Sequence, residues 1–182
     1  MDGSPRSERL RLRFVTHEET RLLNDRYRHD PGGFNDFGGP VVVDAAQNGA
    51  APRGLGELRN DEGGVLWVEL VDGGDPLGTV QYRRIAYGPN RESNGWDIGI
   101  ELRPEARGNG FGAEAQRLLA KWLFETTNAN RVEAQTDVEN IAEARSLEKA
   151  GFKRDGVLRG AQFRAGAYHD LIVYSRLRAD PA

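Results

Sequence analysis

Three glycines stand at alternate positions in one short segment of this chain. The segment reads Arg107, Gly108, Asn109, Gly110, Phe111 and Gly112, and it lies between a strand-like and a helix-like pattern. The start of a helix exposes unpaired backbone N–H groups and roughly half a positive charge. Glycines let the backbone curl and let a bulky anion approach closely, and Arg107 adds a permanent positive charge. The segment is therefore predicted to bind a diphosphate.

Other interpretations of this loop remain open from the residues alone. A glycine-rich turn without any ligand is one, although three alternating glycines are more than a turn needs. A loose NAD fingerprint is another, formed by Gly108, Gly110 and Ala113 with Asp137 as its distant acid. Residues 104–107 separate the strand from the first glycine, which is unusual for that fold. A Walker loop is excluded, because no Lys-Ser or Lys-Thr follows.

The periodicity around the loop predicts alternating strands and helices. Strands are expected at residues 9–15, 65–70, 77–87, 96–102, 131–137, 152–157 and 168–176, with a hairpin turn at 72–75. Helices are expected from His17, where Thr16 and Glu19 have capping-box spacing, after the glycine loop, and at residues 140–150. Within residues 96–102, Trp96, Ile98, Ile100 and Leu102 share one face, and Asp97, Gly99 and Glu101 share the other.

Length and composition suit one domain spanning residues 1–182. The chain contains no cysteine, which excludes disulfides, thiolate zinc sites and a cysteine nucleophile, and fits a cytoplasmic location. Residues 1–10 are too polar for a secretory signal, and no apolar run approaches the ~20 residues of a membrane span. The net charge is -3 and no dense basic stretch occurs, so we expect no nucleic acid, membrane or metal as a partner.

Two motifs in this order resemble those of a known superfamily. Residues 104–112 resemble motif A of the GNAT acetyltransferases, written Arg/Gln-x-x-Gly-x-Gly/Ala, and Asn140 followed by residues 147–152 is similar to their next motif. Residues 8–13, 155–159, 168–170 and 174–175 resemble the branch of ribosomal-protein-alanine N-acetyltransferases (RimJ/RimL-like). The resemblance covers nearly the whole chain, most strongly residues 95–177.

The resemblance implies an α/β fold with a mixed, twisted sheet, flanking helices, and fourth and fifth strands that splay apart to hold acetyl-CoA. In this picture the backbone near Ile100 and Leu102 pairs with the pantetheine arm, and the backbone of residues 107–112 holds the diphosphate. Asn140 contacts the pantetheine or the adenosine-side diphosphate. Its spacing to Glu143 also predicts a helix N-cap, and the two roles are compatible.

Acyl transfer to an amine requires a base, because the amine arrives as an ammonium with a pKa near ~10.4 (lysine) or ~7.7–8.0 (α-amine). Asp97 and Glu101 are the expected bases, and Glu101 is preferred because it lies nearer the loop. Either could instead be an ordinary strand acid or ion-pair partner. His169 is a weaker candidate for the same role.

The proton donor for the leaving group is where the sequence departs from the family. Many members have a tyrosine where this chain has Leu147, and the ribosomal-protein branch often has a serine where this chain has Glu143. Ser146 lies nearby, but we expect the helix to turn it to a different face from that of Glu143. Tyr168 and Tyr174 remain as donors, although strand tyrosines usually serve packing.

The sequence thus predicts an N-acetyltransferase that moves acetyl from acetyl-CoA directly to a primary amine. The acceptor stays open between a protein N-terminal α-amine and a small-molecule amine, and a non-catalytic acyl-CoA sensor is the alternative. Residues 31–64, which carry Phe34 and Phe37, are expected to form a long, partly helical loop region that grips the acceptor. A surface loop or a homodimer contact is the other interpretation of this region.

Overall fold

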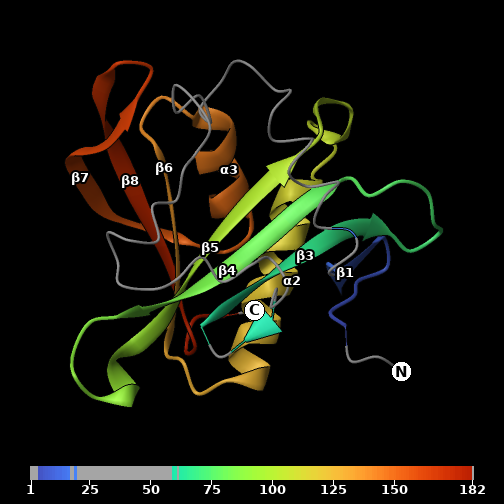
Figure 1. Ribbon diagram of the computed structural model, residues 1–182, viewed down its shortest axis with the longest axis horizontal. Helices are drawn as coiled ribbons and strands as arrows, with labels where there is room; N and C mark the ends of the chain where they lie inside the picture. The colour runs from blue at the N-terminus through green and yellow to red at the C-terminus, as the bar shows by residue number, and fades with distance from the viewer. Residues whose placement is uncertain (1–3, 17–18, 20–58, 61, 182) are drawn as a thin grey trace.

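The computed structural model describes residues 4–16, 19, 59–60 and 62–181. They form one sheet in the order β1-β3-β4-β5-β6-β8-β7, with the short strand β2 beside β3, and two α-helices (Figure 1). The helix expected from His17 and residues 31–58 and 61 of the expected loop region, including Phe34 and Phe37, lie outside the described residues. The end of that region is not a loop, because residues 59–60 and 63–64 pair as strands.

The first part of the sheet is antiparallel. Its strands are β1 (Leu10–Phe14), β2 (Arg59–Asn60), β3 (Gly63–Leu70), β4 (Gly78–Ala86) and β5 (Asn94–Leu102). The predicted hairpin between β3 and β4 is confirmed. Its turn holds Gly73 and Gly74 at φ of +93° and +105°, a backbone region that favours glycine.

The second part alternates helices and strands. Its elements are α2 (Phe111–Thr126), β6 (Arg131–Asp137), α3 (Ile141–Lys149), β7 (Lys153–Arg164) and β8 (Ala167–Leu177), with short 3-10 helices η1 (Arg91–Ser93) and η2 (Pro104–Ala106) before α2. β6 and β7 both pair antiparallel with β8. The expected end of β7 at residue 157 is wrong, because register shifts at Arg154/Gly156 and Leu158/Gln162 let the strand continue.

β5 and β6 run parallel but share a register at only two positions, Trp96 with Val132 and Asp97 with Glu133. Beyond Asp97 the strands diverge toward the end at which α3 lies (Figure 1). We call this divergence the split, and the backbone of residues 98–102 the split edge of β5. The mixed, splayed sheet confirms the expected fold. The NAD interpretation of the glycine loop is wrong, because it requires a doubly wound parallel sheet.

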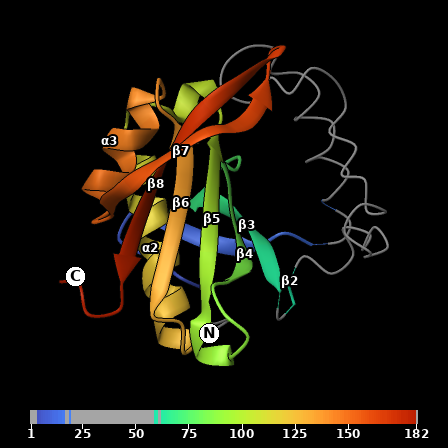
Figure 2. The same cartoon turned by 90° about the vertical axis from the view of Figure 1, so that its left-hand side faces the viewer.

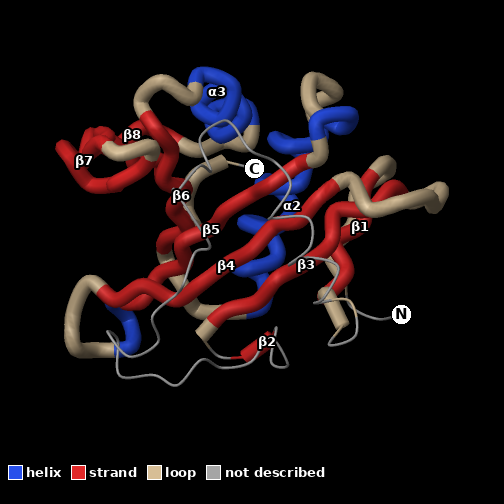
Figure 3. Tube along the Cα trace, turned by 45° about the horizontal axis from the view of Figure 1, so that its top comes forward, coloured by secondary structure: helices blue, strands red, loops and turns tan. Residues whose placement is uncertain are grey.

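One face of the sheet carries both helices (Figure 2), and α2 crosses behind β4 and β5 (Figure 3). The fully buried side of α2 includes Ala115, Leu119 and Leu123. These side chains share one core cluster with the inward-facing strand residues Leu10, Leu12, Leu66, Val68, Val80, Trp96 and Ile98. The predicted faces of β5 are thereby confirmed. Among the described residues, no helix has the length and apolarity needed to cross a lipid bilayer.

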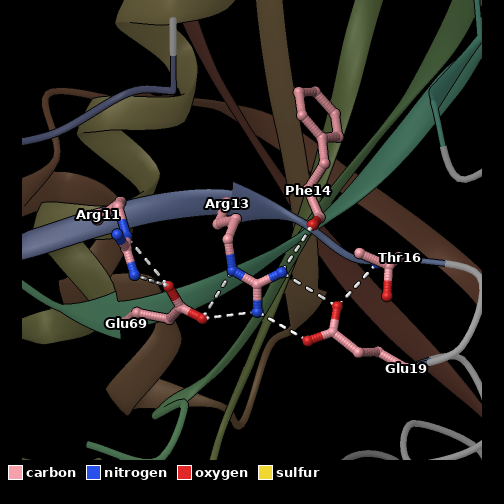
Figure 4. Close-up of polar contacts among 6 residues, drawn as sticks. All are labelled: Arg11, Arg13, Phe14, Thr16, Glu19 and Glu69. Carbon is pink, nitrogen blue, oxygen red and sulfur yellow. Dashed lines mark hydrogen bonds and ion pairs between the residues drawn. The ribbon is translucent and has the colours of Figure 1, made fainter. Parts of the chain in front are cut away.

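The opposite face of β1 and β3 carries a charged network (Figure 4). Glu69 accepts hydrogen bonds from Arg11 Nη2 at 2.7 Å and from Arg13 Nη2 at 2.8 Å. Arg13 also donates to Glu19 at 2.8 Å, which lowers the pKa of Glu19 to about 2. Glu19 accepts from the Thr16 N–H at 2.8 Å, as the predicted capping box requires. The alternating arginines of β1 are therefore ion-pair partners of acids in the same fold.

Candidate active site

The glycine loop, residues 107–112, turns the chain from η2 into α2. Gly108 and Gly110 adopt φ of +80° and +79°, and Gly110 is the N-cap of α2. Among the described residues, no atom lies within 4 Å of a Cβ added at Gly108, so this side of the loop is open to them. No side chain of that part of the chain caps the start of α2, which leaves the N–H groups of its first turn for an anion. The geometry fits the predicted diphosphate.

Side chains of the loop itself hold its shape. Arg107 Nε donates to the Leu102 carbonyl oxygen at 2.9 Å, which ties the loop to the end of β5. Asn109 Nδ2 donates to the Arg107 carbonyl oxygen at 3.1 Å and so closes the turn around Gly108. The guanidinium of Arg107, which is expected to pair with phosphate, thus also fixes the backbone that would bind the phosphate.

Arg9, just before β1, is a neighbour of the loop that sequence reasoning missed. Its guanidinium pairs with Glu114 in the first turn of α2, and Nη1 lies 3.5 Å from the Asn109 carbonyl oxygen. The same group lies 5.0 Å from the centre of the Phe111 ring. Arg9 and Glu114 are 105 residues apart in the chain, so no local pattern could have revealed the pair.

The split edge of β5 meets both helices beside the loop. A Cβ added at Gly112 would lie 2.9 Å from Ser146 Oγ, 3.7 Å from Leu102 Cδ1 and 3.9 Å from Ile100 Cδ1. The end of β5, the first turn of α2 and the middle of α3 therefore converge around Gly112. This convergence explains why a residue without a side chain is needed there.

Asn140 begins α3, and its Oδ1 accepts from the Glu143 N–H at 3.2 Å, so the predicted N-cap is confirmed. The Glu143 carboxyl accepts a hydrogen bond from the side-chain amide of Gln116 on α2, and Ser146 Oγ donates to Gln116 Oε1 at 3.0 Å. The expectation that Ser146 turns to a different face is wrong, because residues three apart on a helix are neighbours. Burial raises the pKa of Glu143 to about 7, although the Gln116 hydrogen bond opposes this.

Asp97 and Glu101 lie on the sheet face opposite the helices. Asp97 occupies the last paired position at the apex of the split, and its Oδ2 accepts from Arg83 Nε at 2.6 Å. Burial raises the pKa of Asp97 and the nearby charge of Glu133 adds to the effect, while Arg83 opposes it. Glu101 lies further along β5, nearer the loop.

The remaining titratable candidates are engaged elsewhere. His169 Nε2 lies 3.1 Å from the Arg164 carbonyl oxygen, and its Nδ1 lies 3.2 Å from Arg164 Nη2. Tyr174 is only 2% exposed and donates to Glu148 at 3.2 Å. Tyr168 is 74% exposed on β8. These side chains are therefore poorer candidates for proton transfer than the carboxyl groups beside the split.

A family model described as an acetyltransferase (GNAT) domain matches residues 9–153, well over half of the chain. The chain belongs to the GNAT acetyltransferases. It is accordingly an acetyl-CoA-dependent acyltransferase. The N-acetyltransferase YoaA of Bacillus subtilis (strain 168) is 28% identical to this GNAT chain over 175 residues, 93% of each protein.

Solved GNAT structures share the fold over nearly the whole chain. RimL, a ribosomal L7/L12 α-N-protein acetyltransferase in complex with coenzyme A, aligns with a TM-score of 0.73 at 18% identity, covering 95% of this chain and 96% of RimL. A spermidine N-acetyltransferase from Vibrio cholerae, in complex with CoA and spermine, aligns with a TM-score of 0.71 at 18% identity, covering 96% and 98%. Both alignments show that this chain has the GNAT fold.

Proposed function

We propose that this GNAT enzyme transfers the acetyl group of acetyl-CoA directly to a primary amine while both substrates are bound. The observation that carries the proposal is the split, which is narrow at Asp97 and has the glycine loop beside its wide end. A cofactor held by its diphosphate at the loop can lay its arm along the split edge of β5. Its reactive end then points toward the apex.

The cofactor contacts follow from this arrangement. The backbone of Ile100 and Leu102 would pair with the arm, and residues 107–112 would hold the diphosphate on the first turn of α2. The bond from Arg107 to the Leu102 carbonyl oxygen supports this assignment, since it fixes the loop relative to the split edge. Asn140 caps α3 beside the same split and would contact the arm or the diphosphate.

The geometry changes the preferred base. The sequence favours Glu101 for its closeness to the loop, but in this arrangement the loop would bind the diphosphate and the thioester would lie at the other end of the arm. Four residues of strand separate the two acids, roughly 13 Å along β5, so only one of them can meet the reacting amine. We therefore propose Asp97, whose pKa burial raises toward the range useful for a base, and keep Glu101 as the alternative.

The acceptor class is a primary amine, and two kinds remain. RimL is an acetyltransferase for a protein α-amine, and the Vibrio enzyme acetylates spermidine. An α-amine, with a pKa near ~7.7–8.0, needs less help from a base than an alkyl amine near ~10.4. An amine panel must therefore contain both N-terminal peptides and polyamines.

Ligand binding and turnover test the proposal separately. CoA at about 100 times its Kd should stabilise the fold by ~2.7 kcal/mol, a rise in Tm of roughly 5–10 °C for a chain of this size, whereas NAD should have no effect. Thiol release from acetyl-CoA should then require an amine, and initial-rate lines should intersect. Parallel lines would indicate an acetyl-enzyme and refute direct attack. Binding without thiol release from any amine would instead favour a sensor.

A further inference from the structure

We propose that the side-chain amide of Gln81 donates a hydrogen bond to a carbonyl oxygen of the bound substrates, an inference that rests on the proposed acetyl transfer. Gln81 lies on β4, outside the glycine loop and outside both motifs of the sequence. Its side chain crosses β5 two residues beyond the apex of the split. The position of this side chain carries the proposal.

Gln81 lies on the same face of the sheet as the proposed base. In the β4–β5 register Gln81 is opposite Gly99, and Arg83 is opposite Asp97. Side chains of directly opposed residues in an antiparallel pair stand on the same face. The 2.6 Å contact between Arg83 Nε and Asp97 Oδ2 shows this for the neighbouring pair. The Gln81 side chain is therefore on the side of β5 from which an amine would meet Asp97.

The end of the Gln81 side chain lies across the backbone of β5. A Cβ added at Gly99 would lie 3.0 Å from Gln81 Nε2, 3.3 Å from its Cγ and 3.6 Å from its Cδ. Gly99 is not among the glycines with a positive φ, so its backbone conformation does not require glycine. The space above Gly99 does require it, because any larger residue would push the amide away.

This place lies on the path of the proposed cofactor arm. Gly99 belongs to the split edge and is two residues beyond Asp97, the last position paired with β6, or roughly 7 Å along the strand. An arm that runs along this edge from the loop toward the apex brings its thioester to the stretch between Glu101 and Asp97. The amide over Gly99 stands in the middle of that stretch.

The amide is a hydrogen-bonding group available to a ligand. Gln81 is exposed, and among the described residues no hydrogen bond engages its side chain. Nε2 is closer than Oε1 to the position above Gly99, so the donor end of the amide lies over β5. An NH2 group there fits a carbonyl oxygen.

Two substrate carbonyls satisfy this chemistry. One is the acetyl carbonyl of the thioester, which becomes an oxyanion when the amine attacks. The other is the first carbonyl of an acceptor peptide, which is separated from the α-amine by a single carbon. A polyamine has no carbonyl group. The choice of acceptor therefore distinguishes the two sources of the oxygen.

Gln81→Ala removes the amide and should lower kcat/KM while the Kd of CoA changes less than two-fold. If the amide meets the acetyl carbonyl, kcat/KM should fall about 10²-fold with peptides and with spermidine alike, the size expected for one oxyanion donor. If it meets the acceptor's carbonyl, kcat/KM should fall roughly 3–10-fold with peptides and stay constant with spermidine. Wild-type kcat/KM with every accepted amine would overturn the proposal.

Gly99→Ala tests the placement of the amide without removing it. The added methyl group would displace Gln81 Nε2 from above β5, so this variant should show the same fall in kcat/KM as Gln81→Ala. The double variant should then be no worse than either single variant. Losses that multiply in the double variant would mean that the two residues act separately, and the proposed placement would be wrong.

The pH profile separates a direct contact from an effect on the base. An amide does not titrate, so the fall caused by Gln81→Ala should be equal at every pH, and the acidic limb of kcat should keep its wild-type position. A shifted limb would show that Gln81 acts through Asp97 and would overturn the assignment. Gln162→Ala removes the same side chain from β7, which does not border the split, and is the matched control. Failure of the wild type to release thiol with any amine would instead count against the proposed function.

Discussion

Glu143→Gln should stabilise the fold at alkaline pH and have little effect at acidic pH. The pKa of this carboxyl is about 7 in the folded chain, against an ordinary value of 4.5, because burial disfavours the charge. Between these two values the native state holds more protons than the unfolded state. The contribution of Glu143 to the stability of the folded state is therefore fully present below pH 4.5 and is lost as the pH rises through 7.

The size of the effect follows from the same two values. The difference, 7 minus 4.5, is 2.5 pH units. At 1.36 kcal/mol per unit this corresponds to roughly 3 kcal/mol in full, and the partial exposure of the side chain reduces it. Glutamine avoids the cost, since it never ionises. The free energy of unfolding of the variant should thus gain about 2 kcal/mol on wild type between pH 5 and pH 8.

Urea unfolding and thermal melts at pH 5, 6.5 and 8 measure this gain. For a chain of this length the difference at pH 8 corresponds to roughly 4–8 °C in Tm. Glu148→Gln, which removes a carboxylate from an exposed position on the same helix, is the matched control. A Glu143→Gln difference that stays constant with pH would mean that burial does not raise the pKa of Glu143 in the fold. The burial argument would then be wrong, whatever the enzyme kinetics show.

Other substitutions test the loop, the base and the frame of the split. Gly110→Val forces a β-branched residue into φ of +79°, so CoA affinity measured by calorimetric titration should collapse while the fold survives; an unchanged affinity would make the loop a mere turn. Asp97→Asn should lower kcat by about 10²–10⁴-fold and Glu101→Gln much less. If Glu101→Gln lowered kcat more than Asp97→Asn did, the base would be Glu101. Since burial raises the pKa of Asp97, wild-type kcat should also fall as this carboxylate protonates at acidic pH. Asp137→Asn leaves the Arg164 guanidinium buried beside an uncharged partner and should cost about 3–5 kcal/mol in urea unfolding, so a loss below ~1 kcal/mol would contradict the importance of this pair.

Local features of the site could be predicted from the sequence. Asn140 and Glu143 have the spacing of an N-cap and its partner, and the bond forms as expected. Alternation along β5 placed Trp96 and Ile98 in the core and Asp97 on the other face. These predictions succeed because they depend only on strand and helix geometry over a few residues.

Features made by distant segments could not be predicted. The pair between Arg9 and Glu114 joins residues far apart in the chain. The raised pKa of Glu143 depends on its burial, which no pattern within α3 encodes. The position of the split apex depends on the register between β5 and β6, which α2 separates in the chain, so the sequence alone could not place Asp97 at the apex. Long-range packing therefore decides which side chains come together beside the split.

The two-position register between β5 and β6 also has a mechanical consequence. The strands β1, β3, β4 and β5 and the strands β6, β7 and β8 are joined within the sheet through a seam of only two residue pairs. A molecule bound along the split edge of β5 would contact both parts of the sheet and restrict their motion relative to each other. Amide hydrogen exchange should then slow in β4 and β8 together when CoA binds, although neither strand borders the split. Binding of CoA in the split would thus reduce local opening in strands on both sides of it.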